Sequence, residues 1–114
     1  MVAVPLLASL SLSGCYNDVE SFVEASAKLD CKRMRECNNS AFVNNHRGEM
    51  AECRSDLEDA YFDAVDLLEG LGWEYDPDGG KECISAKRSL RNDCSNDASQ
   101  EIAESCNDVA DWGG

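Results

Sequence analysis

The chain has 114 residues, 7 cysteines and a formal net charge of −13 at neutral pH. That length suits one domain with a core of modest size, which covalent cross-links help to stabilise. Every charged residue follows position 15, and a domain this acidic repels nucleic acid and anionic headgroups, so the net charge argues against both as ligands.

The N-terminal residues resemble a bacterial lipoprotein signal. An uncharged apolar run, residues 2–12, fits the length of a signal peptide and is well short of the ~20 residues that span a bilayer as a helix. Ser13 and Gly14 are small, and the thiol of Cys15 can carry a lipid. No Lys or Arg precedes the run, which favours a start further upstream. We expect residues 1–14 to be a removed signal peptide and Cys15 to be the lipidated first residue.

The alternative is that this run is an ordinary buried segment and Cys15 a core thiol. The number of cysteines argues against it, because seven leave one unpaired in an oxidising compartment. Lipidation of Cys15 leaves an even set suited to three disulfides: Cys31, Cys37, Cys53, Cys83, Cys94 and Cys106. We therefore expect an exported protein anchored to the bacterial envelope, at the outer membrane and facing the periplasm or the surface. Residues 15–18 would form the tether and residues 19–112 the folded domain.

The first predicted helix covers residues 19–38. Its apolar positions recur every three or four residues: Val19, Phe22, Val23, Ala27, Cys31 and Met34. The asparagine-rich segment 38–47 follows, and we expect a loop there, because asparagine side chains compete with helical hydrogen bonds. His46 is expected at the surface of this loop.

The second predicted helix, residues 50–71, has the clearest pattern. Its apolar face is formed by residues at helical spacing: Met50, Cys53, Leu57, Tyr61, Ala64, Leu68 and Leu71. Gly70 and Gly72 indicate its end. Residues 73–75 are expected to be a short extended piece whose two aromatic side chains fold back over the core.

Asp76 and Pro77 predict the start of a third helix, because aspartate caps free N–H groups and proline suits the first helical position. Its inner face is predicted from Cys83, Ala86, Lys87, Leu90 and Cys94, with the charge of Lys87 reaching the rim. Residues 95–97 break this helix. A fourth helix carries Ile102, Cys106, Val109 and Ala110 and ends near Trp112. Together, these four helices predict an all-α fold: a small four-helix bundle stapled by about three disulfides.

Six cysteines allow fifteen pairings. Cys37 and Cys53 lie about equally far from the middle of the 38–47 loop, so antiparallel helices predict a bridge between them. The same symmetry about the second loop predicts a bridge between Cys83 and Cys106. The remaining bridge would then join the two hairpins: Cys31 to Cys94.

Two pairings within single helices are excluded by distance. Cys31 and Cys37 are about 9 Å apart along a helix axis and Cys83 and Cys94 about 16 Å, whereas a disulfide requires Cα atoms within ~7 Å. The set of Cys31 with Cys83 and Cys94 with Cys106 stays open if the third helix ends early.

The charges are unevenly distributed. An acidic middle is opposed locally by Arg54 alone: Glu49, Glu52, Asp56, Glu58, Asp59, Asp63, Asp66, Glu69, Glu74, Asp76 and Asp78. Basic residues concentrate on its two flanks: Lys28, Lys32, Arg33, Arg35, Lys81, Lys87, Arg88 and Arg91. We expect neighbouring helices to complement one another and the other charges to face water. The alternative is a surface for a cation or a basic partner.

No motif in the sequence indicates a catalytic residue, a metal or a cofactor. Cys31, Cys37, His46 and Cys53 match no common zinc-finger spacing, and an exported chain usually oxidises such thiols. Residues 76–87 resemble part of a calcium loop but place a lysine at the twelfth position, where the loop needs glutamate. A single histidine gives little support to nucleophile activation.

The lipobox-like Leu12-Ser13-Gly14-Cys15 is followed, in order, by Phe22, Cys31, Cys37, Cys53, Tyr75-Asp76-Pro77, Cys83 and Cys94. This order resembles small cysteine-rich lipoproteins of myxobacteria and related soil bacteria. The resemblance implies an envelope location and a stapled helical fold, and it transfers no catalytic residues. The chain departs from that pattern by continuing into a segment with Cys106.

We therefore expect a non-enzymatic, lipid-anchored envelope protein that engages an envelope or extracellular protein or serves structurally. The alternative is a carrier that holds a small apolar ligand between helices. A carrier requires an apolar cavity of several hundred Å³, which we would expect among Phe22, Leu57, Tyr61, Leu68 and Leu90. A small envelope enzyme is the third class.

Overall fold

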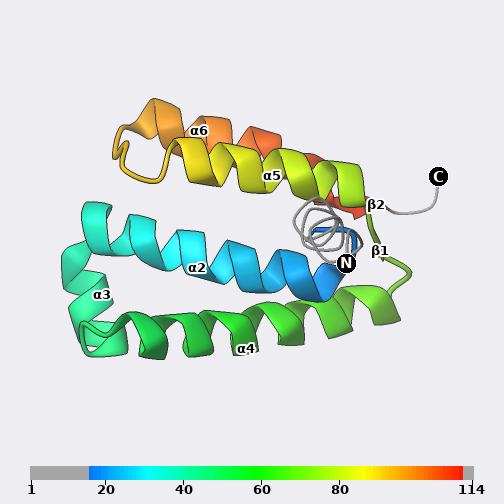
Figure 1. Ribbon diagram of the computed structural model, residues 1–114. Helices are drawn as coiled ribbons and strands as arrows, with labels where there is room; N and C mark the ends of the chain where they lie inside the picture. The colour runs from blue at the N-terminus through cyan, green and yellow to red at the C-terminus, as the bar shows by residue number, and fades with distance from the viewer. Residues whose placement is uncertain (1–15, 112–114) are drawn as a thin grey trace, which may run out of the picture.

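The computed structural model describes residues 16–111, and helices dominate their fold (Figure 1). Helix α2 (Val19–Cys37) lies between α4 (Met50–Gly70) and α5 (Pro77–Ser89), and α6 (Asn96–Ser105) packs against α5. The all-α class is thus confirmed, and so are the three disulfides, which are described below. The expected signal peptide and Cys15 lie outside the described residues.

The two ends of the helical layer are closed differently (Figure 1). At one end, α3 (Asn39–His46) connects α2 to α4. At the other, β1 (Glu74–Tyr75) pairs antiparallel with β2 (Ala110–Asp111), after the short 3-10 helix η1 (Asn107–Val109). The described residues therefore contain five α-helices in place of the expected four. The last of them, α6, ends at Ser105 instead of near Trp112, and η1 and β2 occupy residues 107–111.

Local signals in the sequence explain where α2, α5 and α6 begin. The Asp18 carboxylate accepts a hydrogen bond of 2.7 Å from the Ser21 N–H and caps α2. This bond holds the pKa of Asp18 below its usual value. Asp76 caps α5 in the same way, with Pro77 at the first helical position, as predicted. Ser95 caps α6 through the Ala98 N–H.

The segment between α2 and α4 is a helix, so the predicted loop over residues 38–47 is wrong. Phe42, on the inner side of α3, is buried with Cys31 and Cys53, and this packing outweighs the weak helix propensity of the asparagines. Arg47 ends α3 in the left-handed conformation, with φ of 59°.

Helix α4 forms an edge of the layer and is less buried than predicted. Cys53 is its one fully buried residue, and Ala64 and Leu71, predicted on the inner face, are exposed. After α4, Gly72 adopts a positive φ of 100° and turns the chain so that Trp73 enters the core with 5% of its surface exposed. Tyr75 follows in β1, half-buried, and its ring centroid lies 5.4 Å from that of Phe22. The predicted aromatic return over the core is confirmed.

The disulfides join α2 to α4 and α5 to α6, and one ties the end of α2 to the turn after α5. Cys83 bonds to Cys106, as predicted. The other two predicted pairings are wrong, because the structure joins Cys31 to Cys53 and Cys37 to Cys94.

Both errors follow from how the helices are joined and where they end. Helix α4 begins at Met50, as predicted, but the extra helix α3 changes its position along α2, so Cys53 lies beside Cys31 instead of Cys37. Helix α5 ends at Ser89, earlier than predicted, and leaves Cys94 in a turn from which it reaches Cys37. The early end of α5 was the condition for the alternative set, Cys31 with Cys83 and Cys94 with Cys106, but that set is also wrong.

The first turns of α5 approach neighbouring segments so closely that only glycine fits. A Cβ on Gly79 would overlap the backbone of Asp108, and a Cβ on Gly80 would overlap the ring and hydroxyl of Tyr75. A Cβ on Gly70, the last residue of α4, would meet no neighbouring segment within 4 Å.

We expect Gly79→Ala to lower the free energy of unfolding by about 2 kcal/mol. The overlap with a backbone that cannot move aside costs up to about 3 kcal/mol, which exceeds the gain of about 1 kcal/mol from alanine in a helix. Urea denaturation measures the change. The matched variant Gly70→Ala should be neutral or stabilising, and equal stability of the two variants would contradict the close approach.

Candidate functional site

A hollow with a volume of about 460 Å³ opens on the surface of α2 and is bordered by residues of α4 and α5. Half of the chain's ten cationic side chains line it: Lys28, Lys32, Arg54, Arg88 and Arg91. Among the described lining residues, Glu24 supplies the single carboxylate. We call this feature the cationic hollow.

Three helices bring the cations together. Lys28 and Lys32 lie one turn apart on α2, and Arg54 comes from the first turns of α4. Arg88 belongs to the last turn of α5, and Arg91 follows that helix. Their charges therefore converge from segments that are far apart in the sequence.

Two contacts hold the arginines of the α5 side in place. Nη2 of Arg88 donates a hydrogen bond of 2.6 Å to the hydroxyl of Tyr16, which also lines the hollow. Nη1 of Arg91 donates to the backbone carbonyl of Arg88. Neither contact neutralises a guanidinium charge, because both acceptors are uncharged.

The cations of the hollow repel one another. The pKa of Lys32 lies below its usual value, first because of the charge of Lys28 and then through desolvation and the charges of Arg91, Arg35 and Arg54. Between residues 16 and 111, ion pairs are formed by Lys87, Arg47 and His46, and none by the five cations of the hollow.

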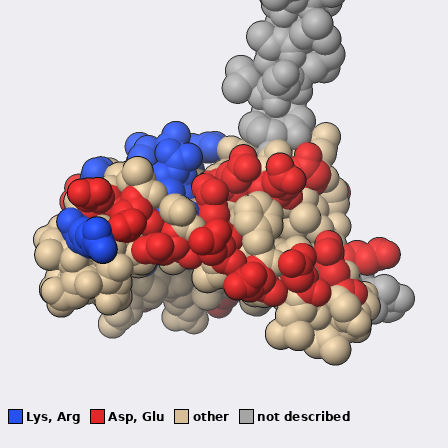
Figure 2. Space-filling view, turned by 90° about the horizontal axis from the view of Figure 1, so that it is seen from below, with Lys and Arg blue, Asp and Glu red and all other residues tan. Residues whose placement is uncertain are grey.

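Apart from Glu24, no carboxylate is among the described residues that line the hollow. Figure 2, viewed from the α4 side, shows Asp and Glu side chains spread across the face and a group of Lys and Arg side chains gathered at one border. Among the described residues, the five cations of the hollow form no ion pair, so the expectation that neighbouring helices complement one another does not hold there.

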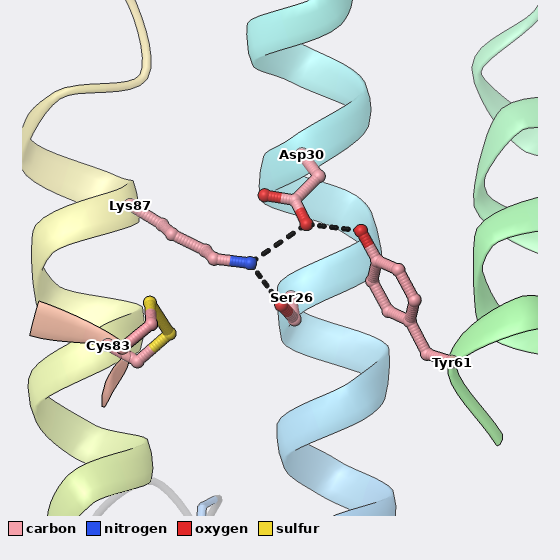
Figure 3. Close-up of polar contacts among 6 residues, drawn as sticks. Ser26, Asp30, Tyr61, Cys83 and Lys87 are labelled. Atoms are coloured by element: carbon pink, nitrogen blue, oxygen red, sulfur yellow. Dashed lines mark hydrogen bonds and ion pairs between the residues drawn. A yellow bond between two sulfur atoms is a disulfide. The ribbon is translucent and has the colours of Figure 1, made fainter. Parts of the chain in front are cut away.

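A second polar group lies between the helices and is formed by Ser26, Asp30, Tyr61 and Lys87 (Figure 3). Nζ of Lys87 lies 2.8 Å from Oδ2 of Asp30 and 2.6 Å from Oγ of Ser26. The hydroxyl of Tyr61 donates to the same Asp30 oxygen at 2.5 Å. We call these four residues the polar core cluster. It joins α2 to both of its neighbours, α4 and α5.

The polar core cluster corrects the predicted position of Lys87. Its side chain is 14% exposed and points inward to Asp30, instead of carrying its charge to the rim. Burial, the nearby Asp30 charge and their hydrogen bond together raise the pKa of Tyr61 well above its usual value. The tyrosine therefore stays protonated and keeps donating. Each member of the cluster has a partner inside it, so we assign it a structural role.

His46 lies at the end of α3, buried, and not on a surface loop as predicted. Its Nδ1 lies 2.7 Å from Oδ2 of Asp56 on α4. The contact joins α3 to α4. Because α3 is helical, His46 turns toward the core, a position that the asparagine-rich sequence around it did not indicate.

The six cysteines predicted to be oxidised are all in bridges, and Cys15 lies outside the described residues. Within residues 16–111, no group of three or more His, Cys, Asp and Glu side chains is placed to hold a metal ion. In the same part of the chain, no helix combines the length and apolar character needed to cross a membrane.

No protein-family model, curated protein or solved structure matches the chain. The resemblance to myxobacterial lipoproteins therefore stays a prediction.

Proposed function

We propose that the protein is a non-enzymatic, lipid-anchored component of the bacterial envelope whose stapled domain serves as an interaction or structural module. The observation that carries this proposal is the division of the cysteines. Three disulfides use six of the seven, and Cys15 is the seventh. A chain with three bridges suits an oxidising compartment, and a cysteine after a short apolar run suits lipidation.

The arrangement of the domain supports a binding role over a catalytic one. The polar core cluster contains residue types found in enzymes, but its members satisfy one another and tie helices together. His46 is engaged with Asp56 in the same way. By contrast, the cationic hollow presents charges that lack a carboxylate partner among the described residues, and such charges are available to a partner molecule.

The carrier alternative gains no support from the hollow. Of the five residues expected around an apolar cavity, none lines the hollow, and each is half-buried among neighbouring helices. Tyr61 uses its hydroxyl to hold Asp30 instead of facing a ligand space.

Metabolic labelling with an alkyne analogue of palmitate tests the anchor. The wild-type chain, expressed in a bacterium that processes lipoproteins, should take up the label and sediment with membranes, whereas Cys15→Ser should lose both properties. The matched variant Cys37→Ser with Cys94→Ser also removes thiols but keeps Cys15, so it should stay labelled. Label retained by Cys15→Ser would overturn the proposal.

A further inference from the structure

We propose that the cationic hollow binds a phosphorylated anion with more than one negative charge, such as a phosphomonoester or a diphosphate group. The inference goes beyond the envelope function and stands without it, because the residues that form the hollow are placed by the fold of residues 16–111.

The first support is the balance of charge. Acidic residues outnumber basic ones 23 to 10 in the chain, yet the hollow contains five cations against the carboxylate of Glu24. Solvated surface cations of such an acidic domain would be expected near carboxylates, as Arg47 is near Glu52. Repulsion inside the hollow falls when an anion enters it, and the gain grows with the charge of that anion.

The second support is the type and arrangement of the donors. Three of the five cations are arginines, whose planar forks bind phosphate oxygens in pairs. The Tyr16 hydroxyl and the Arg88 carbonyl orient two of these forks before any ligand binds. The donors come from three helices that border the space, so an anion that enters it meets cations from more than one segment.

The third support is size. A volume of about 460 Å³ lies within the range of roughly 300–1,000 Å³ that is usual for small-molecule sites. This is more space than one phosphate fills, so it leaves room for part of the group that carries the phosphate. A phosphomonoester carries between one and two charges at neutral pH and three acceptor oxygens, which suits this number of donors better than a single carboxylate does.

The phosphate can come from a soluble ester or from a lipid headgroup. Tyr16 lines the hollow and directly follows Cys15 in the sequence. A lipid on Cys15 would therefore keep the hollow within reach of headgroups. The local cluster of cations would then attract what the net charge of the whole chain repels.

Calorimetric titration of the purified full chain in non-ionic detergent with pyrophosphate tests the proposal. We expect saturable binding that weakens at least tenfold in the double variant Arg54→Gln with Arg91→Gln. The matched variant Arg47→Gln with Lys81→Gln removes the same charge from outside the hollow and should change affinity less than twofold. Circular dichroism of each variant reports whether it is folded.

Two results would overturn the proposal: no saturable binding of pyrophosphate by the folded wild type, or equal weakening in both double variants. A second arm distinguishes the sources. The full chain is placed in bilayer discs that contain either phosphatidic acid, a phosphomonoester lipid, or phosphatidylglycerol as a control. If pyrophosphate binds more weakly in the phosphatidic acid discs but not in the phosphatidylglycerol discs, a headgroup ligand is supported. If binding is unchanged in both kinds of disc, a soluble phosphate ester is supported.

Discussion

Replacing Cys31 and Cys53 together with alanine is expected to lower the free energy of unfolding by about 4 kcal/mol. Their bridge closes a loop with a sequence separation of 22 residues, and its loss returns about 3 kcal/mol of chain entropy to the unfolded state. Both side chains are fully buried against Phe42, so truncation adds a packing loss of about 1 kcal/mol. This is a large part of the stability of a small domain.

Urea denaturation under non-reducing conditions measures that loss. The control Cys37→Ala with Cys53→Ala removes the same number of thiols but breaks two bridges, so it should be less stable still. Greater stability of this control than of the Cys31 and Cys53 variant would contradict the pairing and favour the bridge predicted from sequence.

Lys87→Ala is expected to cost about 3 kcal/mol. The substitution leaves Asp30 without its cation and Ser26 without its donor in the interior between three helices. Breaking a buried ion pair costs roughly 3–5 kcal/mol, and the lower end applies because 25% of the Asp30 side chain still reaches water.

The matched control for this prediction is Lys81→Ala, an exposed lysine on the same helix, which should change stability by less than about 0.5 kcal/mol. Thermal or urea unfolding compares the two. Equal stability of the two variants would show that the ion pair contributes nothing beyond a surface charge.

Local signals made the long helices predictable. The helical spacing of apolar residues in α2 and α4 and the Asp76-Pro77 start of α5 act within a few residues of the positions that they define. Such signals report backbone preference and one buried face, which is enough for the class of fold.

Features that depend on distant contacts were not predictable in the same way. Phe42 stabilises α3 by packing against the disulfide between Cys31 and Cys53, and no neighbouring residue in the sequence predicts this contact. The unpredicted helix also places Cys53 beside Cys31, and the early end of α5 lets Cys94 reach Cys37, which explains the two wrong pairings. The sequence predicts that the charge of Lys87 reaches the rim, because its partner Asp30 lies 57 positions away and no nearby residue indicates the contact.

The cationic hollow illustrates the limit of net charge as a guide. The basic flanks are visible in the sequence, which predicts that neighbouring helices complement one another and that the other charges face water. The fold instead turns Lys28 and Lys32 of one flank toward Arg88 and Arg91 of the other, with Arg54 of the acidic middle beside them. A charge of −13 for the whole chain conceals this local excess of positive charge.

We propose that Cys15 carries a lipid and that the other six cysteines form the disulfides of the fold. Mass spectrometry of a non-reduced proteolytic digest of the chain purified from membranes tests it most directly. We expect an N-terminal peptide that begins at Cys15 with the added mass of a lipid, and three linked pairs: Cys31 with Cys53, Cys37 with Cys94, and Cys83 with Cys106. An unmodified Cys15 still preceded by residues 1–14, or Cys15 within a disulfide-linked peptide, would contradict it.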